Sequence, residues 1–321
     1  MNTSHAQMRC TKGSVFGPVP SRRLGQSLGV NAVPCKTCTY SCVYCQLGPT
    51  THMSVERRAC CGTEWLIEEI LERLDSPASR VDYVTFLGCG EPTLASNMGD
   101  VMKGISASWE GRKALLTNGS LLWMNDVRKE SLGFDVVIPT VSAGNEQLFR
   151  KVHRPHPSLS HKKVSGGMRQ FAAEFPGELW VEVMLLRGIN DDRQSLEEIR
   201  AIIELLKADK IHLTAPIRPP TESWIQCPTK EGVELAMSVI PGALDTTGPE
   251  EGSFGSRRER VVEDVLSMAR IHPMREEQVL DVFRDAGLPQ EEAFDILMHL
   301  LDDDIMVRAE HRGKMFYRTK G

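Results

Sequence analysis

The chain has 321 residues, of which 41% are hydrophobic and 25% are charged, and its formal net charge is −5. These values are typical of a soluble globular protein with one large domain, or with one large and one small domain. No apolar run reaches the roughly 18 residues that a membrane span requires, and the polar start MNTSHAQMRCTKG lacks the apolar core of a signal peptide. We therefore expect a cytoplasmic protein without membrane contact. Any attraction for nucleic acid has to come from a local basic patch, because the net charge is negative.

Short β-branched runs alternate with amphipathic helical stretches through most of the chain. The helical stretches include Thr63–Leu74 and Ser195–Leu206, whose apolar residues recur at helical spacing. This alternation predicts right-handed βαβ units in a parallel sheet, here a partial (βα)6 barrel, because six units fall short of the eight in a closed barrel. The expected strands are Leu28–Val33, Val81–Leu87, Lys113–Thr117, Asp135–Val141, Leu179–Leu186 and Lys210–Ala215.

The last part of the chain has a different pattern. Residues 241–256 are rich in Gly, Pro, Ser and Thr, which predicts a linker between a barrel at residues 1–240 and a small domain at residues 257–321. Three helices and a two-stranded wing in that domain predict a winged helix-turn-helix. The expected helices are Arg258–Ala269, Arg275–Ala286 and Pro289–Leu301, followed by a hairpin of Ile305–Glu310 and Met315–Arg318.

The cysteine content indicates metal ligation rather than a disulfide framework. The chain has nine cysteines, an odd number, and Cys35, Cys38, Cys42 and Cys45 share one short loop. In a reducing compartment such thiols stay reduced and available to metal. Three interpretations are open: a four-thiolate zinc site, a closed ferredoxin-like cluster, and an iron–sulfur cluster that uses only three cysteines and leaves one iron open.

A second motif follows the second expected strand, where residues 88–94 read GCGEPTL. Glycines let the backbone approach a ligand closely, and Glu91 can accept hydrogen bonds from an ammonium group. Ligands of open α/β sheets bind outside the carboxyl ends of the strands, where this turn is expected to lie. The alternative is a simple tight turn.

The two motifs together resemble the radical S-adenosylmethionine (SAM) superfamily. Cys38-x3-Cys42-x2-Cys45, with Tyr44 before the last cysteine, is similar to the superfamily's cluster signature, and the turn at residues 88–93 resembles its methionine-binding motif. The resemblance covers about residues 16–228. The start FGPVPSRRLG and the segments at 211–213 and 218–220 are similar to a branch of iron–sulfur oxidoreductases related to wyosine synthase, a transfer-RNA-modifying enzyme.

This resemblance implies a [4Fe–4S] cluster held by Cys38, Cys42 and Cys45, with SAM on the fourth iron. An electron from the cluster would cleave SAM to methionine and a 5′-deoxyadenosyl radical, and a reductant such as flavodoxin or ferredoxin would supply that electron.

The resemblance also implies contacts to SAM from the strand ends. Gly90 and Glu91 would hold the amino group, Ser142 the ribose or carboxylate, and Tyr44 would lie near the adenine. The remaining expected contacts are Gly88, Thr117 and Asn118.

Six of the nine cysteines have no role in that scheme, and we interpret five of them. Cys35 either tunes or occasionally ligates the cluster or is a plain loop residue, and we favour the loop residue. Cys60, Cys61 and Cys227 either hold an auxiliary cluster or are spectators, which is the simpler interpretation. Cys89 is expected to be a small packing residue.

Residues 147–173 contain no acidic residue and several basic ones, which makes them either a solvated helix face or a cradle for phosphate or carboxylate. With the branch resemblance, this predicts an anionic substrate, first a tRNA nucleoside, then a peptide or protein, then a small molecule. The basic residues are Arg150, Lys151, Arg154, Lys162, Lys163 and Arg169.

The expected third helix of the C-terminal domain carries several acidic residues and should repel DNA, whereas the tail from Arg308 to Lys320 is mostly basic. An alternative of another class is an iron–sulfur redox sensor that acts through the winged helix. A sensor needs no SAM pocket, so the turn at Gly88–Glu91 speaks against it.

Overall fold

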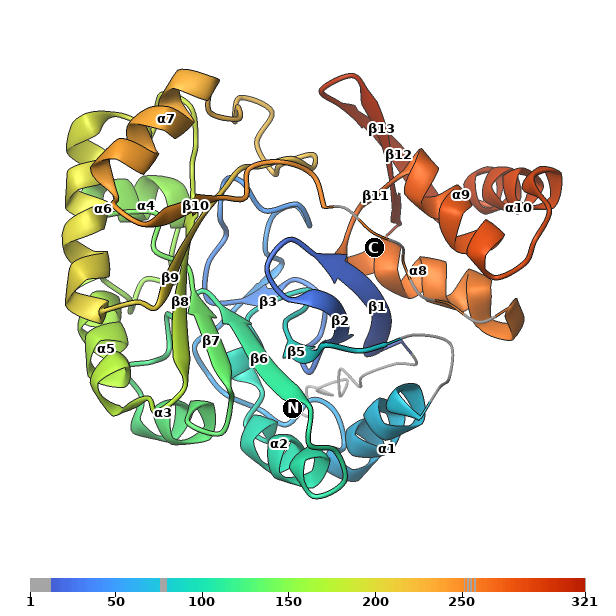
Figure 1. Cartoon of the computed structure of the whole chain (residues 1–321), viewed down its shortest axis with the longest axis horizontal. Coiled ribbons are helices and arrows are strands. Elements are labelled where there is room, and N and C mark those ends of the chain that lie inside the picture. The colour runs from blue at the N-terminus through green and yellow to red at the C-terminus, as the bar shows by residue number, and fades with distance from the viewer. Residues whose placement is uncertain are drawn as a thin grey trace, which may run out of the picture.

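The computed structural model describes residues 13–75, 80–250, 252, 254, 256 and 258–320. Its largest element is an eight-stranded sheet in the order β1-β2-β5-β6-β7-β8-β9-β10 (Figure 1). All neighbours from β2 to β10 are parallel, whereas β1 is antiparallel to β2, so the sheet is open with β1 and β10 at its edges. The strands are β1 Val15–Ser21, β2 Gly25–Val30, β5 Tyr83–Phe86, β6 Arg112–Thr117, β7 Val136–Pro139, β8 Glu178–Met184, β9 Lys210–Thr214 and β10 Ala243–Asp245.

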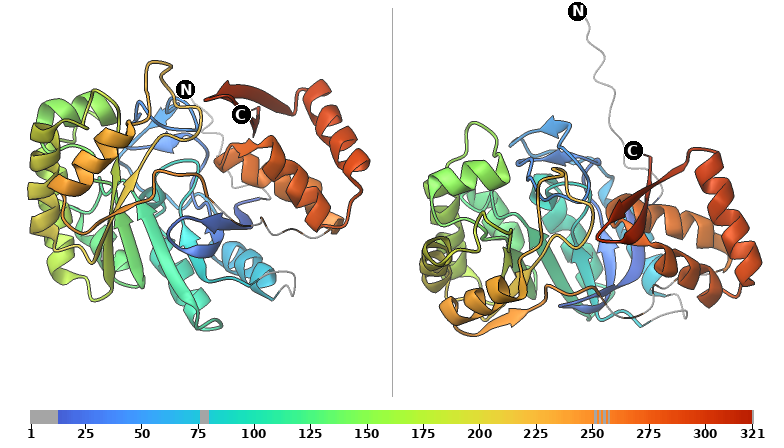
Figure 2. Two further views of the ribbon diagram at one scale, coloured as in Figure 1. Left: turned by 45° about the horizontal axis from the view of Figure 1, so that its top comes forward. Right: turned by 90° about the horizontal axis from the view of Figure 1, so that it is seen from above.

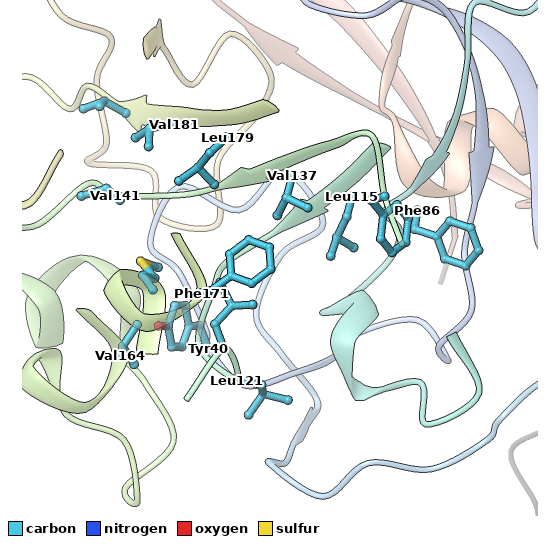
Figure 3. Packing of buried hydrophobic residues seen from close by; sticks show 14 of the residues in the cluster. Tyr40, Phe86, Leu115, Leu121, Val137, Val141, Val164, Phe171, Leu179 and Val181 are labelled. Carbon is cyan, nitrogen blue, oxygen red and sulfur yellow. The ribbon is translucent and has the colours of Figure 1, made fainter. Parts of the chain in front are cut away.

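Helices connect the parallel strands and form an arc outside the curved sheet (Figures 1 and 2). The main core lies between the two layers. Figure 3 shows Leu115, Val137 and Leu179 from neighbouring strands together with Val164 and Phe171 from the helical layer, and all are buried. The helices are α1 Thr63–Leu74, α2 Met98–Ser106, α3 Asn125–Ser131, α4 Glu146–His153, α5 His161–Glu174, α6 Arg193–Leu206 and α7 Lys230–Val239.

The six expected strands and their parallel pairing are confirmed, as is the helix at Thr63–Leu74. The helix expected at Ser195–Leu206 begins earlier, at Arg193, because the carboxylate of Asp192 caps its first turn by accepting from Ser195 N–H. Two strands of the large sheet were not expected. β1 contains Pro18 and Pro20, which a strand tolerates at a sheet edge, and β10 lies inside the span expected as a linker.

The C-terminal part contains the expected three helices and hairpin, and a short additional strand pairs with the hairpin to give a sheet in the order β11-β13-β12. Its side chains form a second core that also includes Phe16 and Val19 of β1. It therefore packs against the β1 edge of the large sheet (Figures 1 and 2). Its elements are η2 Arg258–Arg260, α8 Val261–Ile271, β11 Met274–Arg275, α9 Glu276–Asp285, α10 Gln290–Asp302, β12 Met306–His311 and β13 Lys314–Thr319.

A buried polar group joins the two parts. The guanidinium of Arg218 lies 2.5 Å from Glu250 Oε1 and 2.5 Å from His272 Nε2, and its Nε donates to the Pro273 carbonyl at 2.9 Å. Gln278 of α9 also donates to Glu250 Oε1, at 2.8 Å. The nearby Arg218 cation lowers the pKa of the Glu250 carboxyl despite its burial, so this carboxyl is a carboxylate at neutral pH.

Within the described residues, no helix combines the length and apolarity of a membrane span.

We predict that Arg218→Met destabilises the protein by about 3–5 kcal/mol, because it leaves the Glu250 carboxylate buried without its cation. Chemical denaturation of the two proteins measures the difference. The matched control is Arg200→Met, which breaks an exposed pair with Glu204 and should cost about 0.5 kcal/mol. Equal losses in the two variants would contradict a structural role for the buried pair.

Candidate functional site

The cysteine loop follows β2 and lies outside the carboxyl ends of the parallel strands. Cys38 ends the short strand β3 (Thr37–Cys38), which pairs with β4 (His52–Met53). Cys38, Cys42 and Cys45 all have free thiols and are half-buried. The structure therefore keeps the three predicted cluster ligands together on one loop and available for ligation.

The end of α4 holds this loop in place through backbone hydrogen bonds. Ser41 N–H donates to the His153 carbonyl at 3.0 Å, and Val43 N–H donates to the Val152 carbonyl at 3.0 Å. Just beyond the helix, His156 N–H donates to the Thr39 carbonyl at 2.8 Å. Part of the basic stretch that we considered as a substrate cradle thus supports the cysteine loop.

The side chains of Asn118 and His153 reach sulfurs of the cysteine loop. Asn118 Nδ2 donates to Cys38 Sγ at 3.6 Å, and His153 Nδ1 lies 3.4 Å from Cys42 Sγ. Burial raises the pKa of the Cys42 thiol, and the neighbouring Cys38 and Cys45 raise it further. Burial likewise raises the pKa of Cys38, to about 12. A positive centre bound among these cysteines would therefore favour their thiolate forms.

His153 is a contact that the sequence interpretation missed. It is the last residue of α4 and lies in the stretch of residues 147–173, which we considered above for its basic residues. Its ring is buried 5.2 Å from the Tyr40 ring and 6.0 Å from the Tyr44 ring, measured between centroids. No local signal indicates its contact with Cys42, which lies 111 positions away.

The glycine turn packs directly against the cysteine loop. Lys36 N–H donates to the Cys89 carbonyl at 2.7 Å, and Glu91 N–H donates to the Thr37 carbonyl at 3.1 Å. A Cβ on Gly90 would lie 1.9 Å from the Thr37 carbonyl oxygen, and one on Gly88 would lie 2.0 Å from Asn31 Oδ1. Only glycine allows this approach, so both glycines serve the packing of turn against loop.

Glu91 is buried and organises the strand ends around it. Its Oε1 accepts from Thr93 N–H at 3.1 Å, from the Thr93 hydroxyl at 2.6 Å and from the Thr117 hydroxyl at 2.5 Å. Its Oε2 accepts from Asn118 N–H at 2.8 Å. The carboxylate thus joins β5 to β6, and Oε2 keeps a lone pair for a further donor.

Ser142 is fully buried where β7 leads into α4, and its hydroxyl accepts from Met184 N–H at 2.9 Å. Tyr44 is partly buried against the main core and lies beside Cys42. Gly88, Gly90, Glu91, Thr117 and Asn118 therefore meet around the cysteine loop. The SAM contacts expected of these five residues, and of Tyr44 and Ser142, stay predictions.

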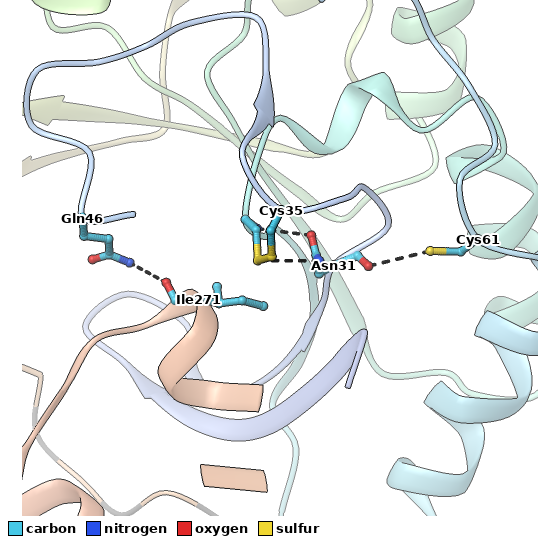
Figure 4. The surroundings of a disulfide bond; sticks show 6 residues. Asn31, Cys35, Gln46, Cys61 and Ile271 are labelled. Carbon is cyan, nitrogen blue, oxygen red and sulfur yellow. Dashed lines mark hydrogen bonds between the residues drawn. A yellow bond between two sulfur atoms is a disulfide. The ribbon is translucent and has the colours of Figure 1, made fainter. Parts of the chain in front are cut away.

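Our interpretation of Cys35 and Cys89 as a plain loop residue and a small packing residue is wrong. They form a disulfide with a Cα–Cα distance of 4.4 Å, beside Asn31 (Figure 4). The reason is the close packing of loop and turn described above, which brings the two thiols together over a sequence separation of 54 residues. While bonded, Cys35 cannot ligate a cluster.

Three further cysteines lie in the described residues, and one of them, Cys61, donates from Sγ to the Asn31 carbonyl at 4.0 Å beside the Cys35–Cys89 bond (Figure 4). Cys61 is buried in the main core, and Cys60 has a free, partly exposed thiol. Cys227 accepts a hydrogen bond from Arg312 at 3.3 Å, at the turn of the C-terminal hairpin.

The donor set fits an iron–sulfur cluster better than a zinc ion. A zinc ion needs its thiolates about 2.3 Å from one centre. In the described part of the chain, no three His, Cys, Asp or Glu side chains converge closely enough to hold one metal ion. Thiolates of a cubane bind different irons and stay farther apart, and N–H donors directed at sulfurs are typical surroundings for such clusters.

The fold and this site define a radical SAM enzyme: the chain belongs to the radical SAM superfamily, whose model matches residues 33–206. It is 35% identical over 308 residues to UPF0026 protein MJ1312 of Methanocaldococcus jannaschii, covering 94% of each chain. It is 21% identical over 212 residues to a probable dual-specificity RNA methyltransferase RlmN of Endomicrobium trichonymphae, covering 63% of this chain and 59% of that one. A radical SAM methyltransferase structure from Sphaerobacter thermophilus shares the fold, with a TM-score of 0.52, 17% identity, and coverage of 70% and 67%.

Members of this superfamily use a [4Fe–4S] cluster and SAM and need a reductant. The cofactor and enzyme predictions are thereby confirmed, and the redox-sensor alternative loses its support. The similarity to UPF0026 proteins does not identify the reaction or the substrate of this chain.

We predict that Gly90→Ala displaces the cysteine loop, because the new Cβ would meet a backbone oxygen that cannot rotate away. The melting temperature should fall, by the equivalent of about 1–3 kcal/mol, and the reconstituted protein should hold less iron. Gly166→Ala in α5 is the matched control, since a Cβ there has no neighbour within 4 Å and should stabilise the helix by up to about 1 kcal/mol. Unchanged stability and iron content in Gly90→Ala would refute the packing argument.

We also predict that His153→Phe lowers the reduction potential of the cluster, measured by a redox titration followed by electron paramagnetic resonance. A hydrogen bond to a ligand sulfur stabilises the reduced, more negative cluster, so its loss favours the oxidised form. Asn118→Leu should shift the potential in the same direction. His156→Phe is the control, because Nδ1 of His156 contacts Ser158 rather than a cysteine. The same potential in all four proteins would rule the contacts out as tuning interactions.

Proposed function

We propose that the protein reductively cleaves SAM and abstracts hydrogen from an anionic substrate, with a tRNA nucleoside as the first candidate. The observation that carries the proposal is the packing of three free thiols on one loop against the turn that contains Glu91. When bound, the cluster and SAM together supply a 5′-deoxyadenosyl radical. Flavodoxin or ferredoxin is the proposed reductant.

The residues of the chain bind and orient the reacting groups in this scheme. Cys38, Cys42 and Cys45 hold the cluster, and Glu91 Oε2 accepts from the SAM amino group with its remaining lone pair. Gly90 brings the turn against the cysteine loop, so that amino group and cluster lie side by side. Tyr44 and the main core behind it exclude water from the radical.

The SAM contacts at the other strand ends follow the same arrangement. Gly88 lies in the same turn as Glu91, and the Thr117 hydroxyl at the end of β6 donates to Glu91. Asn118, just after β6, donates to Cys38 Sγ, and Ser142 follows β7. We propose that these positions line the SAM site.

Two observations support RNA as the substrate class. One is the similarity to an RNA methyltransferase. The other is the set of basic side chains on α4 and α5, although several of them are engaged within the protein: Arg150 pairs with Glu146, Arg154 pairs with Glu222, and Lys163 stacks on Trp123. A peptide, a protein or a small molecule is the alternative substrate.

We further propose that the elements from β1 to β10 form a partial barrel, that the segment after Asp245 connects it to the C-terminal part, and that the elements from α8 to β13 form a winged helix. The acidic first turn of α10, with Glu291 and Glu292, disfavours DNA as its partner. In the hairpin, Lys314 contacts Glu277 and Arg312 contacts Cys227, and just after it Lys320 contacts Asp304, so much of the basic tail is engaged within the protein.

The test is anaerobic. The cluster is reconstituted, SAM and dithionite are added, and 5′-deoxyadenosine is quantified with and without tRNA. We expect slow cleavage by the protein alone and faster cleavage with tRNA. Cleavage that tRNA leaves unchanged would move the assignment to a peptide or a small molecule, and no cleavage from an intact cluster would refute the proposed reaction.

Two variants test the residue roles in the same assay. Cys42→Ala should abolish the cluster and with it all cleavage. Glu91→Gln should retain iron but weaken SAM binding about 10- to 100-fold, because it removes a charge-assisted hydrogen bond. SAM affinity that matches wild type in Glu91→Gln would disprove its assignment.

A further inference from the structure

The inner face of the sheet, opposite the helices, changes from apolar to polar along the strands. In β8, Leu179, Val181 and Val183 pack into the main core with the helices, so Trp180 and Glu182 point to the other side. Trp180 joins a small inner cluster with Leu24, Tyr83, Ala114, Val136 and Ile138. Glu182 lies beyond this apolar cluster, two residues nearer the carboxyl ends of the strands.

Two arginines reach this face from the turn between β1 and β2. Arg23 forms an ion pair with Glu182, and both side chains are largely buried. Arg22 Nη1 donates to the carbonyls of Thr246 and Gly248, at 2.5 and 3.0 Å, just beyond β10. The side chains of this turn therefore reach across the open side of the sheet and place two guanidinium groups on its inner face.

His212 is the third member of the group. It is the β9 partner of Glu182 in the sheet register, on the face opposite to Leu213 of the main core. Its side chain is only 4% exposed, and in the described structure neither ring nitrogen has a hydrogen-bond partner. A buried polar ring without partners is costly unless something else supplies the missing hydrogen bonds.

The charges of this group do not balance. Glu182 pairs with Arg23, whereas no carboxylate in the described part of the chain forms an ion pair with Arg22. Burial lowers the pKa of Arg22 and the neighbouring Arg23 lowers it further, although the charges of Glu182 and Glu250 act in the opposite direction. Glu250 is itself paired with Arg218, so the arginines around this group still outnumber the carboxylates. A further anion would relieve this repulsion.

The group also lies next to the proposed SAM contact Ser142. Val141 N–H donates to the Glu182 carbonyl at 2.8 Å, and Met184 N–H, two residues after Glu182, donates to the Ser142 hydroxyl at 2.9 Å. A molecule anchored at Arg22, Arg23 and His212 would extend from the inner face toward the place where SAM is cleaved.

We propose that Arg22, Arg23 and His212 form a binding subsite for one anionic group, a carboxylate or a phosphate, of the substrate or a co-substrate. The guanidinium groups supply charge and fork-shaped donors, and His212 supplies a ring N–H. Glu182 holds Arg23 in position. The role of this subsite in the reaction rests on the proposed function. Anion binding at the subsite does not, because binding requires no turnover.

The experiment measures anion binding by thermal unfolding of the cluster-loaded protein. Sodium phosphate and sodium acetate are compared with sodium chloride at equal ionic strength, for the wild type, Arg22→Met, His212→Leu and the control Arg193→Met. Arg193 is an exposed residue of α6. We expect one of the two anions to raise the melting temperature of the wild type and the control, and to have no such effect on the two subsite variants. The more effective anion identifies the group as phosphate or carboxylate.

His212→Leu has a second expected result that is independent of any ligand. Its melting temperature without added anion should exceed that of the wild type, because leucine removes two ring nitrogens that lack partners. A marked fall would mean that the ring is satisfied in the free protein, and would overturn the proposal.

The outcomes separate the subsite from the reaction. No anion effect on the wild type, or an equal effect on all four proteins, overturns the subsite even if SAM is cleaved. A selective anion effect in a protein that cleaves no SAM supports the subsite and refutes the proposed function. If Arg22→Met does not fold, Arg22→Lys replaces it, because lysine keeps the charge but loses the fork of donors.

Discussion

The site depends on one buried carboxylate. Glu91 accepts hydrogen bonds from the ends of two strands through its side chain and donates from its backbone N–H to the cysteine loop. A buried carboxylate is costly without such partners, so its burial forces the strand ends and the loop into one arrangement. Gly90 makes the same arrangement possible sterically, because any side chain there would meet the Thr37 carbonyl. The packing around the three cysteines is thus set by hydrogen bonds and contacts within the protein.

The end of α4 completes this support from the other side. Its last carbonyls accept from Ser41 and Val43, and its last residue, His153, turns its ring toward Cys42. A loop that is hydrogen-bonded on both sides has little freedom to change the spacing of its thiols. That rigidity suits a cluster whose open iron has to meet a second ligand at a fixed place.

The open sheet creates a different problem, which charged side chains solve. A sheet with two free edges leaves its inner face accessible, and here Arg22 and Arg23 cross that side while Arg218 and Glu250 join the C-terminal part. Buried ion pairs add little net stability, because desolvation offsets most of the attraction. The Arg23–Glu182 pair on the inner face is therefore consistent with the anion subsite that we propose there.

Local patterns in the sequence were sufficient for most of the fold. Apolar residues at helical spacing and short β-branched runs predicted six strands and their parallel order, since each signal lies within one element. The strands that escaped prediction lack such a signal. β1 is interrupted by prolines, and β10 has only three residues in a segment rich in glycine and proline.

The sequence by itself determined the chemistry of the site: three cysteines at a spacing that one loop can present, and a glycine turn with a carboxylate after the second strand that was expected. Only the tertiary structure decided which groups surround them. The Cys35–Cys89 bond, the contact of His153 with Cys42 and the meeting of Arg23 with Glu182 join residues far apart in the chain. Such contacts arise when strands and helices pack against one another, so no pattern of neighbouring residues encodes them, whereas ligand spacing within one loop is a local property.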